Sequence, residues 1–133
     1  MMTKAAVFFS LSLLLFPPTR AEQEEQTVKI AIASDGKTID SPLSSKAARC
    51  KYFLIFDEEG QLTEVLDNPH GNVPGSAGPK AADFLAQKEV TLLVARTIGP
   101  KMIAALQTKE IAHLEFSGTV EEGLEYALKK LKE

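Results

Sequence analysis

Residues 90–106, VTLLVARTIGPKMIAAL, constrain the fold of this chain more than any other stretch. The segment begins with an unbroken apolar run at 91–95, which is typical of a strand buried on both faces of a sheet. Gly99 and Pro100 interrupt the run, and apolar residues at helical spacing follow, with Pro100 suited to the first helical position. The pattern therefore predicts a strand, a glycine turn and a helix. In an α/β sheet such a turn lies at the carboxyl end of a strand, where free amides and the helix dipole favour an anion.

The first 21 residues form a separate unit that we expect to be removed. A basic start at Lys4 precedes an apolar core at 5–16, which is shorter than the roughly 20 residues of a membrane-spanning helix. Two prolines and then Ala21 follow, as in a secretory signal peptide that is cleaved after Ala21. We therefore expect a secreted or periplasmic protein with no membrane span after cleavage. The alternative is that residues 1–21 form a buried N-terminal helix.

The rest of the chain suits a single acidic domain. Residues 22–27 are polar and predict a flexible leader, and residues 28–133 are enough for one hydrophobic core. Loss of residues 1–21 leaves 13 basic against 18 acidic residues, which is a formal charge of −5 in place of −3. Nucleic-acid binding needs a basic face, so we expect no nucleic-acid partner. The chain has neither a Gly-x-Ser-x-Gly nor a Walker motif, and we expect it not to be an enzyme.

Strand and helix patterns follow one another along the domain in the order β-β-β-α-β-α-β-α. Five segments have strand patterns: residues 28–33, 52–57, 61–66, 91–95 and 110–116. Three segments have helix patterns: residues 79–88, residues 100–106, and the C-terminal segment that Thr119 and Glu122 begin with a capping box. Residues 38–51 predict a long loop. An antiparallel meander followed by right-handed crossovers predicts an α/β fold in which helices flank a mixed sheet of about five strands.

Three glycine-bearing loops are predicted to meet at one edge of this sheet and to bind an anion. Their candidate residues are Ser34, Asp35, Gly75, Gly78, Arg96 and Gly99. Arg49 and Arg96 are the arginines that remain after residue 21, and a guanidinium fork can hold a multi-oxygen or multi-sulfur anion. The alternative is that the glycines serve ordinary turns and that both arginines are surface charges.

Cys50 and His70 are the candidate metal ligands. Cys50 is the one cysteine of the chain and has the same parity as Tyr52 in the strand that follows. As a soft-metal ligand it would be helped by Arg49 and Lys51, whose charges favour a thiolate. His70 lies in a loop rich in proline and glycine. The alternatives are a small buried hydrophobe for Cys50 and a solvated loop residue for His70.

Five stretches of the sequence resemble a known family. They read KIAIASDG, ARCKYFLIFD, NPHGNVPGSAGPKAADFLAQKEV, IGPKMIAAL and SGTVEEGLEYAL. They are similar to the dinitrogenase iron–molybdenum cofactor biosynthesis family, which includes NifX-like proteins, the C-terminal domain of NifB-like proteins and the orange protein. The similarity spans residues 28–131. It implies a ribonuclease-H-like three-layer fold and a non-enzymatic protein that binds, stores or hands over metal–sulfur clusters.

The same resemblance implies the ligand and the partners. The ligand would be a molybdenum-, iron- or copper-containing sulfur cluster or a small anion, and a protein partner would take part in cluster transfer. Two segments depart from the family pattern: Lys46-Ala47-Ala48 stands where relatives carry His-Phe-Gly, and Arg96-Thr97 replaces a double glycine. We expect an exported carrier of a metal or an anionic metal–sulfur cluster. The alternative is an envelope protein-interaction module on the same fold that has lost cluster binding.

Overall fold

Five strands form one mixed sheet in the computed structural model, which describes residues 27–133. The strands are β1 Ile30–Ser34, β2 Tyr52–Phe56, β3 Leu62–Asp67, β4 Leu92–Ala95 and β5 Ala112–Glu115. Their order across the sheet is β3-β2-β1-β4-β5. Strand β1 pairs antiparallel with β2 and parallel with β4, and β4 pairs parallel with β5. The predicted signal peptide, and the predicted leader except for Thr27, lie outside the described residues.

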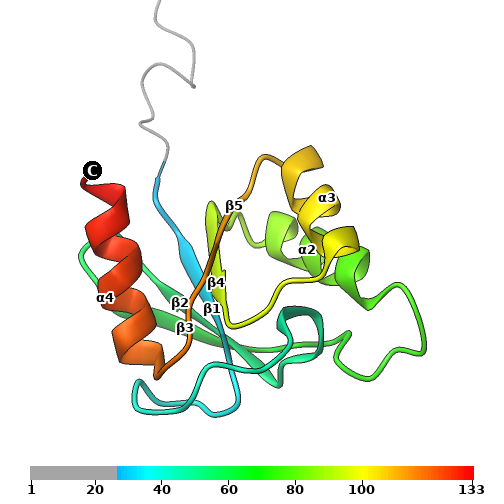
Figure 1. The fold of residues 1–133 in the computed structure, drawn as a ribbon, viewed down its shortest axis with the longest axis horizontal. Coiled ribbons are helices and arrows are strands. Elements are labelled where there is room, and N and C mark those ends of the chain that lie inside the picture. The colour runs from blue at the N-terminus through cyan, green and yellow to red at the C-terminus, as the bar shows by residue number, and fades with distance from the viewer. Residues whose placement is uncertain (1–26) are drawn as a thin grey trace, which may run out of the picture.

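Helices cover both faces of the sheet. They are the 3-10 helix η1 Ala47–Arg49 and the α-helices α2 Ala77–Gln87, α3 Pro100–Thr108 and α4 Val120–Leu131. Helix α4 lies on one face of the sheet, and α2 and α3 lie together on the other (Figure 1). The predicted three-layer α/β fold is therefore confirmed. Helix η1 lies inside the segment predicted as a loop, because three residues are too few to show a helical period. Within residues 27–133, no helix is both long and apolar enough to cross a membrane.

Strands β1 and β4, which lie side by side within the sheet, are buried on both faces. Leu92 and Val94 pack on the side of α4, and Leu93 and Ala95 pack on the side of α2 and α3. This arrangement confirms the prediction from the unbroken apolar run. Ala95, the last residue of β4 before the Gly99 turn, therefore faces α2 and α3.

The predicted capping box is present at the start of α4. The amide of Glu122 donates to Thr119 Oγ1 at 3.2 Å, and the amide of Thr119 donates to Glu122 Oε1 at 3.0 Å. Such a cap contributes about 1 kcal/mol to stability. The box lies at the opposite face of the sheet from α2 and α3, so it stabilises the fold without touching the turn after β4.

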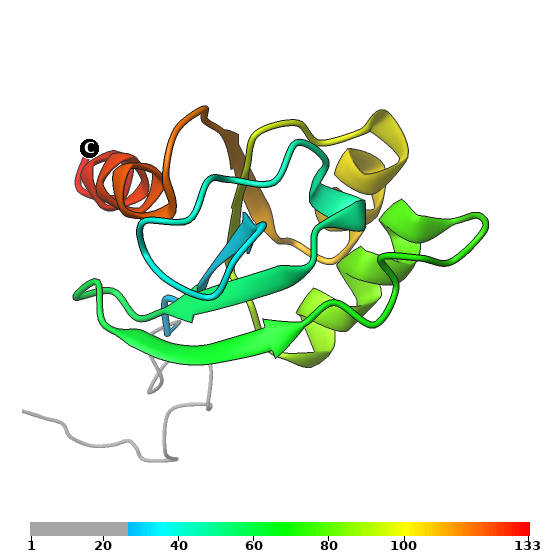
Figure 2. The same cartoon turned by 90° about the horizontal axis from the view of Figure 1, so that it is seen from below.

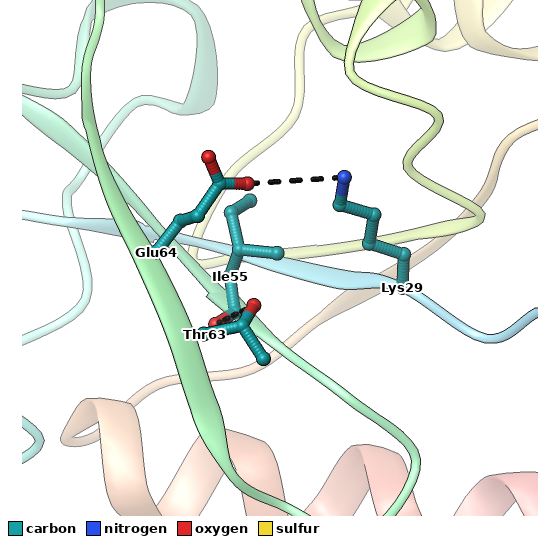
Figure 3. A network of polar contacts seen from close by, with 4 residues as sticks. All are labelled: Lys29, Ile55, Thr63 and Glu64. Carbon is teal, nitrogen blue, oxygen red and sulfur yellow. Dashed lines mark hydrogen bonds and ion pairs between the residues drawn. The ribbon is translucent and has the colours of Figure 1, made fainter.

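Strand β3 forms one exposed edge of the sheet and carries polar contacts on its surface (Figure 3). Lys29 Nζ lies 3.8 Å from Glu64 Oε1, across the intervening strand that carries Ile55. The hydroxyl of Thr63 donates to the Ile55 carbonyl at 3.2 Å. Both charged side chains reach solvent, so the ion pair adds only about 0–1 kcal/mol.

Candidate anion-binding site

A pocket of about 470 Å³ opens between η1, the start of α2 and the turn that joins β4 to α3. Figure 2 shows η1 beside α2 and α3 at this end of the molecule. The lining residues are Lys46, Ala47, Ala48, Arg49, Ser76, Ala77, Gly78, Pro79, Thr97, Gly99, Pro100, Lys101 and Met102. The volume lies within the range of small-molecule sites, about 300–1,000 Å³. The pocket stands at the carboxyl end of β4, where the sequence predicted a ligand.

The charges at this pocket are all positive. Lys46, Arg49 and Lys101 line it, and no aspartate or glutamate is among its lining residues. Most of the remaining wall is apolar or glycine, including Ala47 and Met102. Cations on a partly apolar wall attract an anion more strongly than the same cations would in open water, because the local dielectric constant is lower. The pocket is therefore suited to a negatively charged ligand.

Two helix N-termini also meet at this pocket. The first amides of an α-helix have no partner within the helix. Ser76, at the cap position of α2, has a left-handed φ of 58° and makes no side-chain cap bond, and Gly99 at the cap of α3 has no side chain to make one. The amides of Ala77, Gly78 and Lys101, which line the pocket, have no backbone partner within residues 27–133, whereas Met102 is buried and its backbone packs against Gly78. Both helix dipoles therefore add to the positive field of the side chains.

Gly78 allows these two helix starts to approach closely. A Cβ atom at Gly78 would lie 3.0 Å from Met102 Cβ, 3.2 Å from Met102 N and 3.3 Å from Met102 Cα. Most of that contact is with backbone, which cannot turn aside. The sequence placed Gly78 in the loop before the helix; the structure corrects this, because α2 begins at Ala77 and Gly78 is inside it.

The substitution Gly78→Ala should lower the free energy of unfolding by about 1–3 kcal/mol, because α2 and α3 must separate to admit the methyl group. The better helix propensity of alanine offsets this by at most about 1 kcal/mol. Gly75→Ala is the matched control: nothing lies within 4 Å of a Cβ atom there, and the change should stay within about 0.5 kcal/mol. Denaturant unfolding measures both values. Equal stability of the two variants would contradict the close helix contact.

Arg49 lines the pocket and also holds the neighbouring loop. Its Nη1 atom donates to the carbonyls of Gly71 at 3.2 Å and Val73 at 2.7 Å. The side-chain amide of Asn68 adds bonds to the carbonyls of Ala48 at 3.0 Å and Cys50 at 2.9 Å. These contacts tie the segment between β3 and α2 to η1. Arg49 therefore contributes a positive charge to the pocket and also holds in place the loop that borders it.

The turn after β4 is held from two sides. The amide of Ala47 donates to the Thr97 carbonyl at 2.9 Å. The amide of Ile98 donates to Glu115 Oε2 at 3.0 Å. The sequence predicted that amides of this turn face a ligand, but a carboxylate of the protein already binds the Ile98 amide. The open amides are instead those of the two helix starts.

Four of the predicted anion-binding residues do not line the pocket. Ser34 is fully buried, and its hydroxyl bonds both the amide and the carbonyl of Gly36, which closes a tight turn. Asp35, Gly75 and Arg96 are exposed and lie outside the pocket lining. Of the predicted anion set, the structure brings together Arg49, Gly78 and Gly99.

Cys50 is buried and its thiol is protonated at neutral pH. The side chain packs with Phe53 in the core under α2, so the parity inferred from Tyr52 is wrong, because η1 ends at the residue before Cys50. Burial raises the pKa of the Cys50 thiol to about 12, against weaker opposing hydrogen bonds from Ser34 and Asn68. The argument that neighbouring cations favour a thiolate is therefore wrong, since desolvation outweighs them.

His70, the other candidate metal ligand, is half-buried beside α2. Its ring meets the ring of Phe84 edge-on, with centroids 6.4 Å apart, and its backbone amide donates to Asn68 Oδ1 at 3.0 Å. Among residues 27–133, no group of three His, Cys, Asp or Glu side chains is arranged to hold a metal ion. The pocket thus offers cations and amides to a ligand, and its lining holds no thiol, imidazole or carboxylate that could bind a metal.

Comparison with known proteins identifies the family. A family model described as Dinitrogenase iron-molybdenum cofactor matches residues 28–130. The chain belongs to this family. The match covers all five strands and the helices between them, so the predicted resemblance is confirmed. A search of curated proteins found no significant match.

Several solved structures share the fold. The apo form of the orange protein from Desulfovibrio gigas is 25% identical with a TM-score of 0.71, over 77% of this chain and 88% of that one. A Thermotoga protein of the NifB type is 33% identical with a TM-score of 0.66, over 77% and 88%. A dinitrogenase-related protein from Methanococcus jannaschii, 20% identical, has a TM-score of 0.58 over 79% and 90%, which shows the fold alone.

Several residues of the site were not among the sequence candidates: Ser76, Lys101, Asn68 and Glu115. Lys101 follows Pro100 at the start of a predicted helix, and a cation at that position was the available signal. Asn68 precedes a proline at the start of the loop, where an asparagine side chain often bonds the backbone. No local signal pointed to Glu115, because its partner lies 17 residues away in the chain.

Proposed function

We propose that this protein is a non-enzymatic carrier of an anionic metal–sulfur cluster or a related thiometallate, bound in the pocket between η1, α2 and α3. The observation that carries the proposal is a pocket with three cationic side chains and no acidic one. Two comparisons support a metal–sulfur cargo. The chain belongs to the family described as Dinitrogenase iron-molybdenum cofactor, and its fold is similar to that of the orange protein.

The donor set fits a cargo whose metals already have their own ligands. Lys46, Arg49 and Lys101 would contact the outer sulfur or oxygen atoms of the anion, together with the open helix amides. By the family resemblance, Lys46 stands at the position of a histidine, so a charge contact would take the place of a metal bond. The cargo is therefore held by charge and hydrogen bonds around its surface, and its metal atoms remain bonded to sulfide.

Under this proposal, some of the predicted site residues take part in binding and others do not. Arg49, Gly78 and Gly99 take part, since they line the pocket. Cys50 and His70 take no part as metal ligands. The thiol of Cys50 is buried with a raised pKa, and a protonated thiol is a poor ligand.

The cellular setting of the carrier rests on the sequence. The basic start and the short apolar core at 5–16 support export with cleavage after Ala21. We propose that the exported domain holds its cargo outside the cytoplasm and releases it to a protein partner. A pocket without metal–protein bonds suits such release, because no coordination bond has to break.

The proposal is tested with the purified protein and three probes: tetrathiomolybdate, molybdate and Cu²⁺. We expect saturable binding of tetrathiomolybdate, followed by its visible absorption, with an affinity that falls as salt is raised. Protein from its native compartment should contain metal together with acid-labile sulfide. Colourless, metal-free protein that takes up none of the probes would contradict the proposal and favour the interaction module. Stoichiometric Cu²⁺ uptake without anion binding would contradict the proposal that the cargo is held by charge and hydrogen bonds around its surface.

A further inference from the structure

Glu115 is the acidic side chain that reaches the turn beside the pocket. It lies at the last position of β5, where the parallel register places it opposite Ala95, the last residue of β4. Because Leu114 packs on the side of α4, Glu115 faces the side of α2 and α3. From there Oε2 accepts the Ile98 amide at 3.0 Å.

The hydrogen bond between Glu115 and the Ile98 amide holds a residue whose chain neighbours line the pocket. Ile98 is 4% exposed, and its chain neighbours Thr97 and Gly99 both line the pocket. Gly99 is also the cap residue of α3, whose carbonyl receives the first helical bond from Ile103 at 2.9 Å. The direction in which the turn enters α3 therefore depends on what holds the Ile98 amide.

A second hydrogen bond holds the same turn, and we call the two bonds together the clamp. On the opposite side of the turn, the Ala47 amide of η1 donates to the Thr97 carbonyl at 2.9 Å. Thr97 and Ile98 are thus held from two elements far apart in sequence, η1 and β5. The Thr97 bond is between backbone atoms and does not depend on the side chain. The Ile98 bond depends on the carboxylate of Glu115 alone.

We propose that Glu115 is a positioning residue for anion binding, which fixes the turn so that the open amides at the start of α3 face the pocket. This inference rests on the proposed function. Glu115 itself is outside the pocket lining and would not touch the ligand. Its carboxylate also keeps the Ile98 amide from binding solvent or a second anion, so the pocket presents one arrangement of donors.

Two variants separate the roles of the hydrogen bond and the charge. Glu115→Gln keeps an oxygen that can accept the Ile98 amide, whereas Glu115→Ala removes the acceptor. We expect Glu115→Ala to weaken tetrathiomolybdate binding about tenfold or more, as the loss of a bond to a charged acceptor allows. Glu115→Gln should bind within about threefold of the original protein. Amide hydrogen exchange at Ile98 should accelerate in Glu115→Ala and stay slow in Glu115→Gln.

Two controls distinguish positioning from general effects. Glu125→Gln makes the same charge change on α4, and Thr119→Ala removes the capping box at a cost of about 1 kcal/mol; both should bind tetrathiomolybdate as the original protein does. If Glu115→Ala binds as tightly as the original protein, or if Glu115→Gln is as weak as Glu115→Ala, the inference is overturned. Failure of the original protein to bind would contradict the proposed function, and the Ile98 exchange rates would still test the clamp.

Discussion

Reversing two charges at the pocket, in the double variant Lys46→Glu/Lys101→Glu, should lower the affinity for tetrathiomolybdate at least about a hundredfold. Both side chains line the pocket, and a hydrogen bond to a charged group contributes about 1.5–3 kcal/mol. Reversal removes two such contacts and adds two repulsions. Absorption titration at two salt concentrations measures the effect, and the residual binding should lose most of its salt dependence.

The matched control for this variant is Lys129→Glu/Lys132→Glu, which changes the net charge equally near the C-terminal end of α4. We expect its affinity for tetrathiomolybdate to stay within about threefold of the original protein, because charges beyond one Debye length, about 8–10 Å, are largely screened. Thermal unfolding of both variants shows whether the fold is intact. An equal loss of affinity in both would mean that net charge, and not the pocket, governs binding.

Alkylation of native Cys50 by iodoacetamide near pH 8 should be about a thousandfold slower than alkylation of the unfolded chain. The thiolate is the reactive form. Burial raises the pKa of Cys50 from 9.0 to about 12, so the thiolate fraction falls by that factor. Mass spectrometry over time, with and without guanidinium, gives the two rates. Native alkylation at the unfolded rate would show that the thiol is exposed and available to a metal.

The same pKa predicts how stability depends on pH. The folded protein binds the thiol proton more tightly than the unfolded chain does, so this contribution to stability is fully present below about pH 9. It is lost as the pH rises toward 12, because the unfolded chain ionises first. The unfolding free energy of the original protein should therefore fall more steeply between pH 9 and pH 12 than that of Cys50→Ala. Parallel curves for the two proteins would contradict the raised pKa.

The elements of the fold could be predicted because their signals are local. The apolar run of β4, the capping box of α4 and Pro100 at the first position of α3 each depend on a few neighbouring residues. Boundaries moved by one to two residues at several elements, as at α2, which begins at Ala77. That shift moved Gly78 from a loop to a helix contact. Its role depends on Met102, which the sequence places in a different helix.

Part of the site could not be predicted, since its contacts join distant segments. Arg96 and Lys101 are both cations near the Gly99 turn, and only the path of the chain decides that Lys101 lines the pocket while Arg96 points elsewhere. Cys50 was assigned a face by extending the alternation of a strand backward. The 3-10 helix before it breaks that alternation, and the side chain enters the opposite core.

By itself, the sequence determined the layers, the order of the strands along the chain and the end of the sheet at which a pocket opens, because burial patterns and turn residues act over short distances. The tertiary structure decided which amides and charges meet there. The Ile98 amide is bound by Glu115 and the thiol of Cys50 is buried, whereas two helix starts and three cations share one pocket. The physical reason is that a site is made by side chains from separate segments, and their approach depends on how the helices pack on the sheet.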